Sequence, residues 1–383
     1  MLPRTVETHV TRRALNLLKR RAQTAISAIL AAAAVWLSLS GPAGAADSAV
    51  ILMYHRFGES AFPSTNIRLA QFEAHIAELA SGPYTVMSVP DIVAAIREGR
   101  ELPDRTVGIT IDDGYRSIYT EAWPRLRRAG FPFTVFVSTD PVDRGFSDFM
   151  DWEQVRELHE AGVTIGGHTA THLHMAANSV ERNESDLALS NARYVSELGA
   201  VPELFAYPFG EASTRVERIV RDAGYATAFG QHSGPSDASA DPYYMPRFAL
   251  NEAFGDMDRF RLVTNALSIP HTDMTPANPT LTQNPPIFGF TRAADSPPIK
   301  GLACYAADQG QVRVEEIGPR IEVRMDDPFQ PAGPGSTAPV WGLTGAGIGL
   351  GCSTTCHDPR NRPADRNREQ RPPVPVVCVG RLP

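Results

Sequence analysis

The sequence predicts an α/β fold built on a mainly parallel sheet, because strand-like and helix-like segments alternate from residue 49 to about 250. Short apolar runs rich in β-branched residues, such as Val107–Ile111 and Phe133–Val137, indicate buried strands. Between them, apolar residues recur at helical spacing, as in Arg68–Ala80. Polar motifs follow the ends of three strands, where sites collect in parallel α/β folds. These patterns do not distinguish an open sheet from a closed barrel.

Capping residues and apolar spacing locate the helices. Ser88 can cap a helix that runs through Ile96, with Gly99 beyond its end. A long helix is expected over Ser179–Leu198, with Tyr194 on its inner face. Further helices are expected around Ile118–Ala129, Val155–Leu158 and Val216–Val220.

Two adjacent carboxylates, Asp112 and Asp113, end the strand Val107–Ile111, and Gly114 follows them. Adjacent residues on a strand point to opposite faces, so the two carboxylates share a site only if the chain turns there. Gly114 gives the backbone the freedom for such a turn. One carboxylate could then bind a metal while the other handles a proton. Taken alone, the pair is explained as well by a helix cap after a strand.

Two histidines, His168 and His172, follow another apolar strand, Val163–Ile165. Their spacing of four brings the rings together if the segment forms a helical turn. Two histidines and one carboxylate make a three-ligand site with open positions, which is typical of a catalytic metal. Zinc is the default metal, and Co²⁺, Ni²⁺ or Fe²⁺ also suits these ligands. His174 lies close by and could be confused with a ligand.

Three motifs in this order, Thr110–Gly114, His168–His172 and Tyr207–Gly210, resemble the signature of the polysaccharide deacetylases, the carbohydrate esterases of the NodB-homology type. Val50–Arg56 and Asp151–Val155 resemble the branch that includes poly-N-acetylglucosamine deacetylases. The resemblance covers roughly residues 49–271. It implies a distorted (β/α) barrel, usually of seven strands, and hydrolysis of acetamide groups on an N-acetylhexosamine polysaccharide with release of acetate.

The resemblance also implies roles for individual residues. It makes Asp113, His168 and His172 the metal ligands. It makes Asp112 the general base that accepts a proton from the attacking water. The backbone N–H of Phe209 is then a donor to the oxyanion that forms.

The chain departs from the family pattern at Ala206, because many members have an arginine there that pairs with the catalytic base. Without that cation, the pKa of Asp112 is expected to lie higher. Arg247 could supply the charge from another strand, or it could be a solvated surface arginine. No general acid is assigned, since the late segment Ser268–His271 fits the family motif poorly.

Four further residues are candidates for substrate binding: Tyr115, Trp152, Tyr207 and His55. Each is explained nearly as well as a core or satisfied buried side chain. Two other functions stay open: a catalytically weak glycan-binding protein of the same fold, and a hydrolase of non-peptide C–N bonds in small amides. A third function, that of a non-haem iron oxygenase, is disfavoured because this sequence lacks the arginine pattern that a 2-oxo-acid site needs.

The chain is expected to have four parts. Residues 1–45 have a positive segment, an apolar run and small residues at the end, which predicts a signal peptide and export to the periplasm or the cell exterior. A membrane association is expected only if this segment is retained. Residues 46–271 form the catalytic domain, 272–328 a linker and small β module, and 329–383 a low-complexity, disordered tail. The tail could also reflect a reading-frame error.

Charge and cysteine content bear on partners. Residues 46–383 carry 30 Lys and Arg against 42 Asp and Glu, a net charge of −12. This argues against nucleic-acid binding and favours a neutral or cationic glycan as substrate. The sequence does not indicate an oligomeric state. The cysteines are interpreted as structural or incidental, and they are Cys304, Cys352, Cys356 and Cys378.

Overall fold

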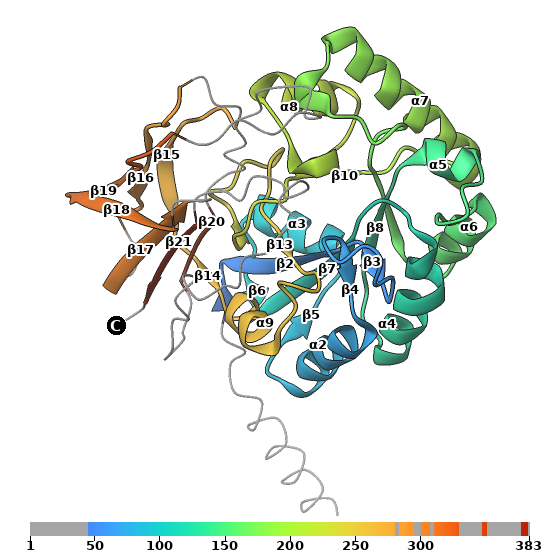
Figure 1. The fold of residues 1–383 in the computed structure, drawn as a ribbon, viewed down its shortest axis with the longest axis horizontal. Helices are drawn as coiled ribbons and strands as arrows, with labels where there is room; N and C mark the ends of the chain where they lie inside the picture. Colours follow the sequence, from blue (N-terminus) through green and yellow to red (C-terminus); the bar gives the residue numbers. More distant parts are fainter. Residues whose placement is uncertain are drawn as a thin grey trace, which may run out of the picture. The chain divides into compact units, whose positions relative to one another are not determined.

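A curved, mainly parallel sheet lies at the centre of the computed structural model, which describes residues 45–279, 283–294, 300–306, 310–328, 347–350 and 377–381 (Figure 1). Its strands follow the order β11-β10-β9-β8-β7-β2-β12. The parallel strands are β2 (Ser48–Tyr54), β7 (Thr106–Ile111), β8 (Thr134–Val137), β9 (Thr164–Gly167), β10 (Leu204–Ala206) and β11 (Thr227–Phe229). Two short strands extend the sheet: β12 (Ser236–Asp237) pairs antiparallel with β2, and β5 (Thr85–Val86) pairs with β7.

One further segment, residues 245–249, joins the two ends of the parallel sheet. Met245 forms a parallel bridge with Phe229 at the end of β11, and its N–H donates to Ala228 O at 2.9 Å. A few residues later, β13 (Phe248–Ala249) pairs in parallel with β2. The sheet therefore curls into a distorted (β/α) barrel, as the resemblance implies, and the element that closes it is only a few residues long.

Helices cover the outside of this sheet in Figure 1, and most begin and end within about two residues of the predicted bounds. The helix expected around Ile118–Ala129 begins with a turn of π-helix, η1 (Ile118–Ala122). At the helix Val89–Glu98, the side chain of the capping residue Ser88 accepts a hydrogen bond from the N–H of Asp91, and Gly99 follows the last residue with φ 63°. The helices are α2 (Leu69–Ser81), α3 (Val89–Glu98), α4 (Trp123–Ala129), α5 (Thr139–Asp143), α6 (Trp152–Glu160), α7 (Val180–Leu198), α8 (Thr214–Asp222) and α9 (Met257–Thr264).

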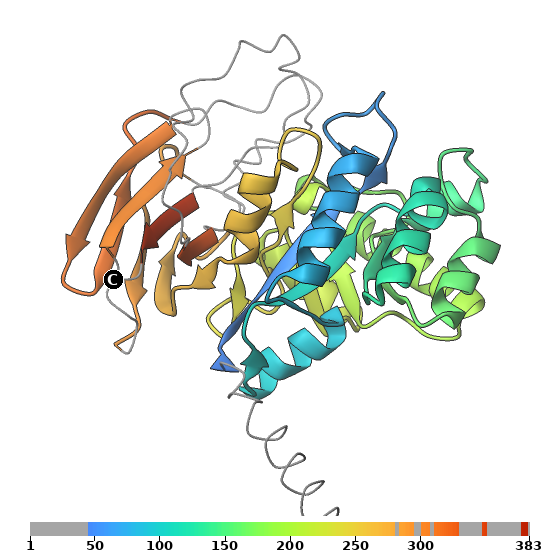
Figure 2. The ribbon, with the colours of Figure 1, turned by 90° about the horizontal axis from the view of Figure 1, so that it is seen from below.

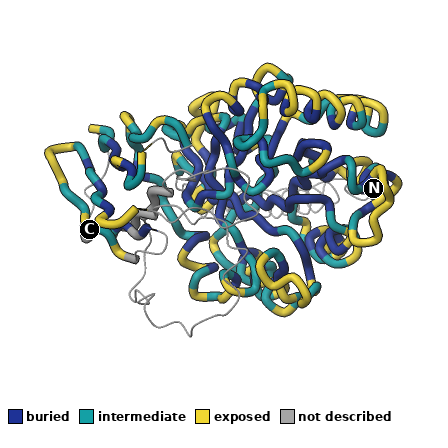
Figure 3. Tube along the Cα trace, turned by 45° about the horizontal axis from the view of Figure 1, so that its top comes forward, coloured by how far each residue is buried: buried dark blue, intermediate teal, exposed yellow. Residues whose placement is uncertain are grey.

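The core fills the space between the strands and these helices. In Figure 3 the strands of the parallel sheet are mostly dark blue, and the exposed segments lie on helix surfaces and loops. Burial of both faces explains why these strands are continuous apolar runs in the sequence. No helix among the described residues is both long and apolar enough to cross a lipid bilayer.

A second sheet follows the barrel in the chain, with the order β14-β20-β21-β17-β18-β19-β16-β15. The hairpin β18–β19 matches the two β-like runs predicted for the β module, and Figure 2 shows its strands side by side in orange. Its core includes Ile269, Phe288, Phe290 and Ile321. The strands are β14 (Leu267–Ser268), β15 (His271–Thr275), β16 (Phe288–Arg292), β17 (Lys300–Ala306), β18 (Gly310–Ile317), β19 (Arg320–Arg324), β20 (Gly347–Leu350) and β21 (Val377–Arg381).

Two short segments within residues 329–383, the range predicted to be a tail, are strands of this sheet. β20 pairs with β14 and β21, and β21 pairs with β17. Their backbone groups are satisfied by strands far away in the sequence, a stabilisation that local composition does not reveal. In the same pairing Cys304, which is disulfide-bonded, lies opposite Cys378. The rest of the predicted tail and residues 1–44 of the predicted signal peptide lie outside the described residues.

Glu217 is a buried acid on the inner face of α8, only 6% exposed. Burial, together with the negative charge of Asp241, raises its pKa to about 7, although Arg221 opposes the shift. Between its ordinary pKa of 4.5 and about 7, the folded chain binds more protons at this site than the unfolded chain. Folding stability therefore decreases as the pH rises through this interval.

We expect Glu217→Gln to remove this loss of stability. Relative to the wild type, the variant should gain roughly 2 kcal/mol of unfolding free energy at pH 8 and almost nothing at pH 4.5, because one pKa unit corresponds to about 1.4 kcal/mol before solvent screening. Denaturant unfolding at both pH values measures the difference. Glu203→Gln, at an exposed acid, is the matched control. An equal gain at both pH values would contradict the assignment.

Candidate active site

The two carboxylates after β7 point in different directions because the backbone turns at Asp113. The N–H of Asp112 still donates to Tyr54 O of β2 at 2.9 Å, so Asp112 continues the strand pairing. Asp113 then adopts φ 77° and Gly114 φ 90°. The turn predicted at Gly114 therefore begins one residue earlier, in a conformation that few non-glycine residues adopt. Asp112 faces Arg247 and Asp113 faces the histidines.

Asp113, His168 and His172 form a compact cluster of possible metal ligands. The Nε2 atoms of the two histidines lie 3.1 and 3.2 Å from the same oxygen, Oδ1 of Asp113. The candidate ligand atoms of the three residues all lie within 4.8 Å of one another. Asp113 and His168 are buried, whereas the side chain of His172 is 30% exposed. One edge of the cluster is therefore accessible to a ligand.

The segment between the two histidines is a loop, not the helical turn that would bring rings spaced by four onto one helix face. Thr169 and His172 have φ values of 62° and 53°, in the left-handed region. The Oγ1 of Thr169 accepts a hydrogen bond from the N–H of Leu173 at 3.1 Å. The rings converge because the loop folds back on itself, not because they share a helix face. Tertiary contacts from α7 and β8 stabilise this shape.

Asp186 of α7 is the main anchor of this loop. It is 1% exposed, and its carboxylate accepts hydrogen bonds from the N–H of Ala170 at 2.7 Å and the N–H of Thr171 at 3.2 Å. The hydroxyl of Thr171 donates to the same carboxylate at 2.7 Å, and Arg182 pairs with it at 3.2 Å. Sequence reasoning missed Asp186. The available signal was a charged residue beside Leu187, on the inward face of a predicted helix.

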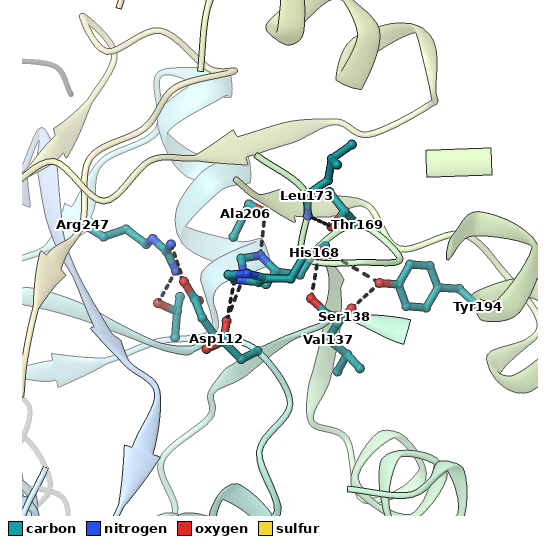
Figure 4. A network of polar contacts seen from close by, with 12 residues as sticks. Asp112, Val137, Ser138, His168, Thr169, Leu173, Tyr194, Ala206 and Arg247 are labelled. Carbon is teal, nitrogen blue, oxygen red and sulfur yellow. Dashed lines mark hydrogen bonds and ion pairs between the residues drawn. The ribbon is translucent and has the colours of Figure 1, made fainter. Parts of the chain in front are cut away.

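Tyr194 and Ser138 hold the backbone of His168 through hydrogen bonds (Figure 4). The Tyr194 hydroxyl accepts from the N–H of His168 at 3.3 Å and donates to Val137 O at 2.5 Å. The Ser138 hydroxyl donates to the carbonyl of His168 at 2.9 Å. Both peptide groups of His168 are therefore fixed by the barrel and by α7, which fixes the direction of its side chain.

The tautomer of His168 tests whether these residues suit a metal ion. Its Nδ1 lies 2.7 Å from Ala206 O, a carbonyl that can only accept, so Nδ1 carries the hydrogen. In the neutral ring Nε2 is then an acceptor that faces Asp113 Oδ1, another acceptor, at 3.1 Å. Two acceptors at this distance need a positive charge between them, either a proton that makes the ring an imidazolium or a metal ion. Two imidazole nitrogens and one carboxylate are a donor set that fits a divalent metal.

Arg247 forms a buried, bidentate ion pair with Asp112 (Figure 4). Its Nη1 and Nη2 donate to Oδ1 and Oδ2 of Asp112 at 2.7 and 2.8 Å, and both residues have no exposed surface. Arg247 also donates to the Thr110 hydroxyl at 3.0 Å and to Gly230 O at 2.9 Å. Burial by itself raises the pKa of Asp112, but the charge and hydrogen bonds of Arg247 outweigh it, so the pKa lies below its ordinary value.

The cation that pairs with Asp112 thus comes from Arg247 in the segment that closes the barrel, while position 206 is an alanine. Ala206 is fully buried at the end of β10, and its carbonyl serves His168. Of the two interpretations of Arg247 given by the sequence, a solvated surface residue does not agree with its burial.

Phe209 adopts φ 60° and ψ 3°, a left-handed conformation, in the turn after β10. Its ring stacks on His174 with centroids 3.6 Å apart and meets the ring of His172 edge-on at 4.4 Å. His174 in turn pairs with Glu211 at 3.0 Å, so it is not part of the ligand cluster. Within the described part of the chain, the N–H of Phe209 donates to no acceptor. It is therefore free to bind a ligand atom beside His172.

Two of the other candidates, Tyr115 and His55, lie beside the carboxylates. Burial, together with the negative charge of Asp113, raises the pKa of Tyr115 above the ordinary value. Burial lowers the pKa of His55, against the opposing charges of Asp113 and Asp112. Both side chains are thus neighbours of the cluster.

Trp152, Tyr207 and His271 make their contacts elsewhere. Trp152 donates through Nε1 to Asp143 at 2.7 Å and packs in the core. The buried Tyr207 donates to Tyr243 O at 2.9 Å. His271 lies on β15 of the second sheet. Among the contacts of the described residues, none joins these three side chains to the cluster.

Comparison with known proteins agrees with this geometry. Residues 99–228 match the family model described as polysaccharide deacetylase. The chain is 26% identical over 206 residues to YxkH of Bacillus subtilis, whose name places it among the polysaccharide deacetylases, and covers 70% of that protein. It is 24% identical over 232 residues to a poly-β-1,6-N-acetyl-D-glucosamine N-deacetylase of Staphylococcus aureus, covering 80% of it. In both cases the match spans 54% of this chain.

The fold is also found in a solved structure. The deacetylase PplD of Streptococcus pyogenes, determined in complex with acetate, superimposes with a TM-score of 0.51 at 19% identity. The superposition covers 54% of this chain and 94% of that one. At this identity the likeness establishes the fold and nothing finer.

The anchoring role of Asp186 predicts an effect on metal affinity. We expect Asp186→Asn to weaken zinc binding by tenfold or more, because the loop between the two histidines loses its charged acceptor and residues that orient ligands typically contribute about 10- to 100-fold. Competition with a chelating dye measures the affinity without any substrate. Glu184→Gln, an exposed acid on the same helix, is the control. Unchanged zinc affinity in a folded Asp186→Asn variant would contradict the prediction.

Proposed function

We propose that the chain, which carries a polysaccharide deacetylase domain of the NodB-homology type, is a metal-dependent N-deacetylase. It hydrolyses acetamide groups of an N-acetylhexosamine polysaccharide and releases acetate. One observation carries the proposal, namely two adjacent carboxylates with different partners. Asp112 pairs with a buried arginine, and Asp113 faces two histidines. The name of the Staphylococcus aureus relative, a poly-β-1,6-N-acetyl-D-glucosamine N-deacetylase, supports this chemistry.

The proposed metal ligands are Asp113, His168 and His172. Zinc is the default, and Co²⁺, Ni²⁺ or Fe²⁺ suits the same donors. When bound, such an ion lowers the pKa of a water molecule and polarises the acetamide carbonyl. The carbonyl of Ala206 keeps Nε2 of His168 free for this purpose.

Asp112 is proposed as the general base. Arg247 keeps it ionised at neutral pH and fixes the plane of its carboxylate. Each carboxylate oxygen has a second lone pair besides the one used by the arginine, so Asp112 can still accept the proton of the attacking water. The acceptor is therefore oriented before the substrate binds, which reduces the reorganisation needed during the reaction.

The N–H of Phe209 is proposed as a donor to the oxyanion of the tetrahedral intermediate. Its free N–H, left-handed backbone and ring contacts with His172 and His174 support this role. A residue held in a sparsely populated conformation costs about 1–3 kcal/mol and persists where the surroundings enforce it. Here the stacked ring holds the peptide beside the cluster, so the donor is preorganised for the charge that develops.

A weakly active glycan-binding protein is less well supported than an enzyme. That alternative rests on Ala206 and on the unassigned general acid, and Arg247 provides the positive charge that Ala206 lacks. The general acid is still unassigned, and acetate release separates the two possibilities. A panel that includes small cyclic amides alongside chitin oligomers, poly-β-1,6-N-acetylglucosamine and peptidoglycan separates a polysaccharide deacetylase from a small-amide hydrolase.

The proposed location is outside the cytoplasm. It rests on the signal-like composition of residues 1–45, not on the described structure. The net charge of −12 for residues 46–383 agrees with a neutral or cationic glycan and with no role in nucleic-acid binding.

We expect Asp112→Asn to lower acetate release from N-acetylglucosamine oligomers by about 10²- to 10⁴-fold, because the amide cannot accept the proton at neutral pH. Zinc content should stay at the wild-type level, since Asp112 faces away from the ligand cluster. Acetate quantification and metal analysis on the same preparation measure both. Acetate release at a near wild-type rate would refute the proposed mechanism.

Metal removal provides the second test. Dialysis against a strong chelator should abolish acetate release, and stoichiometric zinc should restore it, because the three ligands then hold the ion again. Asp113→Asn and His172→Ala should not recover under the same zinc concentration. Full activity in protein shown to be free of metal would exclude metal dependence.

A further inference from the structure

A row of aromatic side chains lies beside the candidate active site and is not used by the proposed chemistry. It consists of Tyr115, Phe149 and Phe146, and we refer to it as the aromatic ridge. The Tyr115–Phe149 ring centroids are 4.7 Å apart, and those of Phe149 and Phe146 are 6.4 Å apart. Tyr115 follows Asp113 by two residues in the turn after β7, so the ridge starts next to the proposed metal ligand. It ends at Phe146, which is 48% exposed.

Backbone hydrogen bonds attach the ridge to the end of β7. The loop from Arg144 to Asp151 connects α5 and α6, and it carries both phenylalanines (Figure 1). Tyr115 and Phe149 form an antiparallel bridge. The N–H of Arg116 donates to Asp148 O at 2.8 Å, and the N–H of Met150 donates to Gly114 O at 3.0 Å. The rings are thus held at a fixed position relative to Asp113.

A second exposed ring continues the row on the other side of Tyr115. The guanidinium of Arg56 lies 3.5 Å from the Tyr115 ring centroid and 4.0 Å from that of Phe62. Arg56 is nearly buried and forms an ion pair with Glu59. Phe62 itself is 43% exposed. Ordered aromatic surface therefore extends away from Asp113 in two directions, through Phe149 and through Arg56.

The chemistry of the substrate explains why such a surface lies here. Exposed large apolar side chains that cluster commonly mark a binding site. A polysaccharide extends beyond the sugar whose acetyl group reacts, and the C–H face of a pyranose ring packs on the face of an aromatic ring. Two arginines flank the rings: Arg56 lies between Phe62 and Tyr115, and Arg144 lies 5.9 Å from the Phe146 ring centroid. Charged groups beside the rings suit a hydroxyl-rich polymer better than the interior of a lipid bilayer.

We propose that the aromatic ridge and Phe62 bind the sugar residues that flank the one being deacetylated. The inference rests on the proposed function, which supplies the polysaccharide substrate. It adds to that function the length of polymer that the site recognises. The ridge makes the enzyme prefer longer oligomers. Its residues bind substrate but take no part in the bond changes.

The test compares chain-length dependence in three variants. Phe146→Ala and Phe62→Ala remove exposed rings, and Leu189→Ala removes a 52% exposed apolar side chain on α7 as the control. Acetate release is measured as kcat/KM on N-acetylglucosamine oligomers from the disaccharide to the hexasaccharide. We expect Phe146→Ala or Phe62→Ala to lower kcat/KM about five- to tenfold on the hexasaccharide and little on the disaccharide, because each variant loses one stacking contact.

The result that overturns the inference is an unchanged chain-length dependence in both phenylalanine variants. Loss of vesicle binding in those variants without a change in chain-length dependence would also overturn it, and would assign the rings to a membrane. If the wild type releases no acetate from any oligomer, the proposed function fails, and calorimetric titration with the hexasaccharide tests the ridge independently. Weaker binding by Phe146→Ala than by Leu189→Ala then supports the ridge, and equal binding refutes it.

Discussion

The site depends on one interaction, the buried ion pair between Asp112 and Arg247. Two charges without solvent exposure cost several kcal/mol each to desolvate, and a buried pair is tolerated only when its hydrogen bonds are complete. Here the guanidinium engages both carboxylate oxygens and also reaches Thr110 and Gly230. The pair therefore fixes the proposed base in one orientation. It also links β7 to the segment that closes the barrel, so the catalytic geometry and the closure of the fold support each other.

Backbone strain is concentrated around the same site. Of the six described non-glycine residues with positive φ, four lie in the cluster or contact it: Asp113, Thr169, His172 and Phe209. Such residues cost about 1–3 kcal/mol each and persist only where neighbours enforce them. Asp186 and Tyr194 provide that enforcement for the histidine loop from a single helix, α7. The helix thus stabilises the ligand geometry without contributing a ligand.

Local patterns in the sequence predict the parts of the structure that local physics decides. The strand before Asp112 and the Ser88 cap follow from apolar runs and capping chemistry, and the structure has them where expected. The pairing of Asp112 with Arg247 joins residues 135 positions apart, which no periodicity encodes. The loop shape around His168 depends on contacts from α7, and the strand at Gly347–Leu350 depends on distant partners. Tertiary contacts therefore decide both features, and local patterns in the sequence do not encode them.

The position of Arg247 in the closing segment has a consequence for biosynthesis. A chain emerges from the ribosome with its N-terminus first, so all three proposed metal ligands are complete by residue 172, long before residue 247. A nascent or clipped chain that ends between residues 206 and 247 contains these ligands, their anchors on α7 and Ala206, but lacks the cation that pairs with Asp112. The family match itself ends at residue 228, before this arginine. The proposed base therefore acquires its partner only in the finished barrel, after most of the domain has been synthesised.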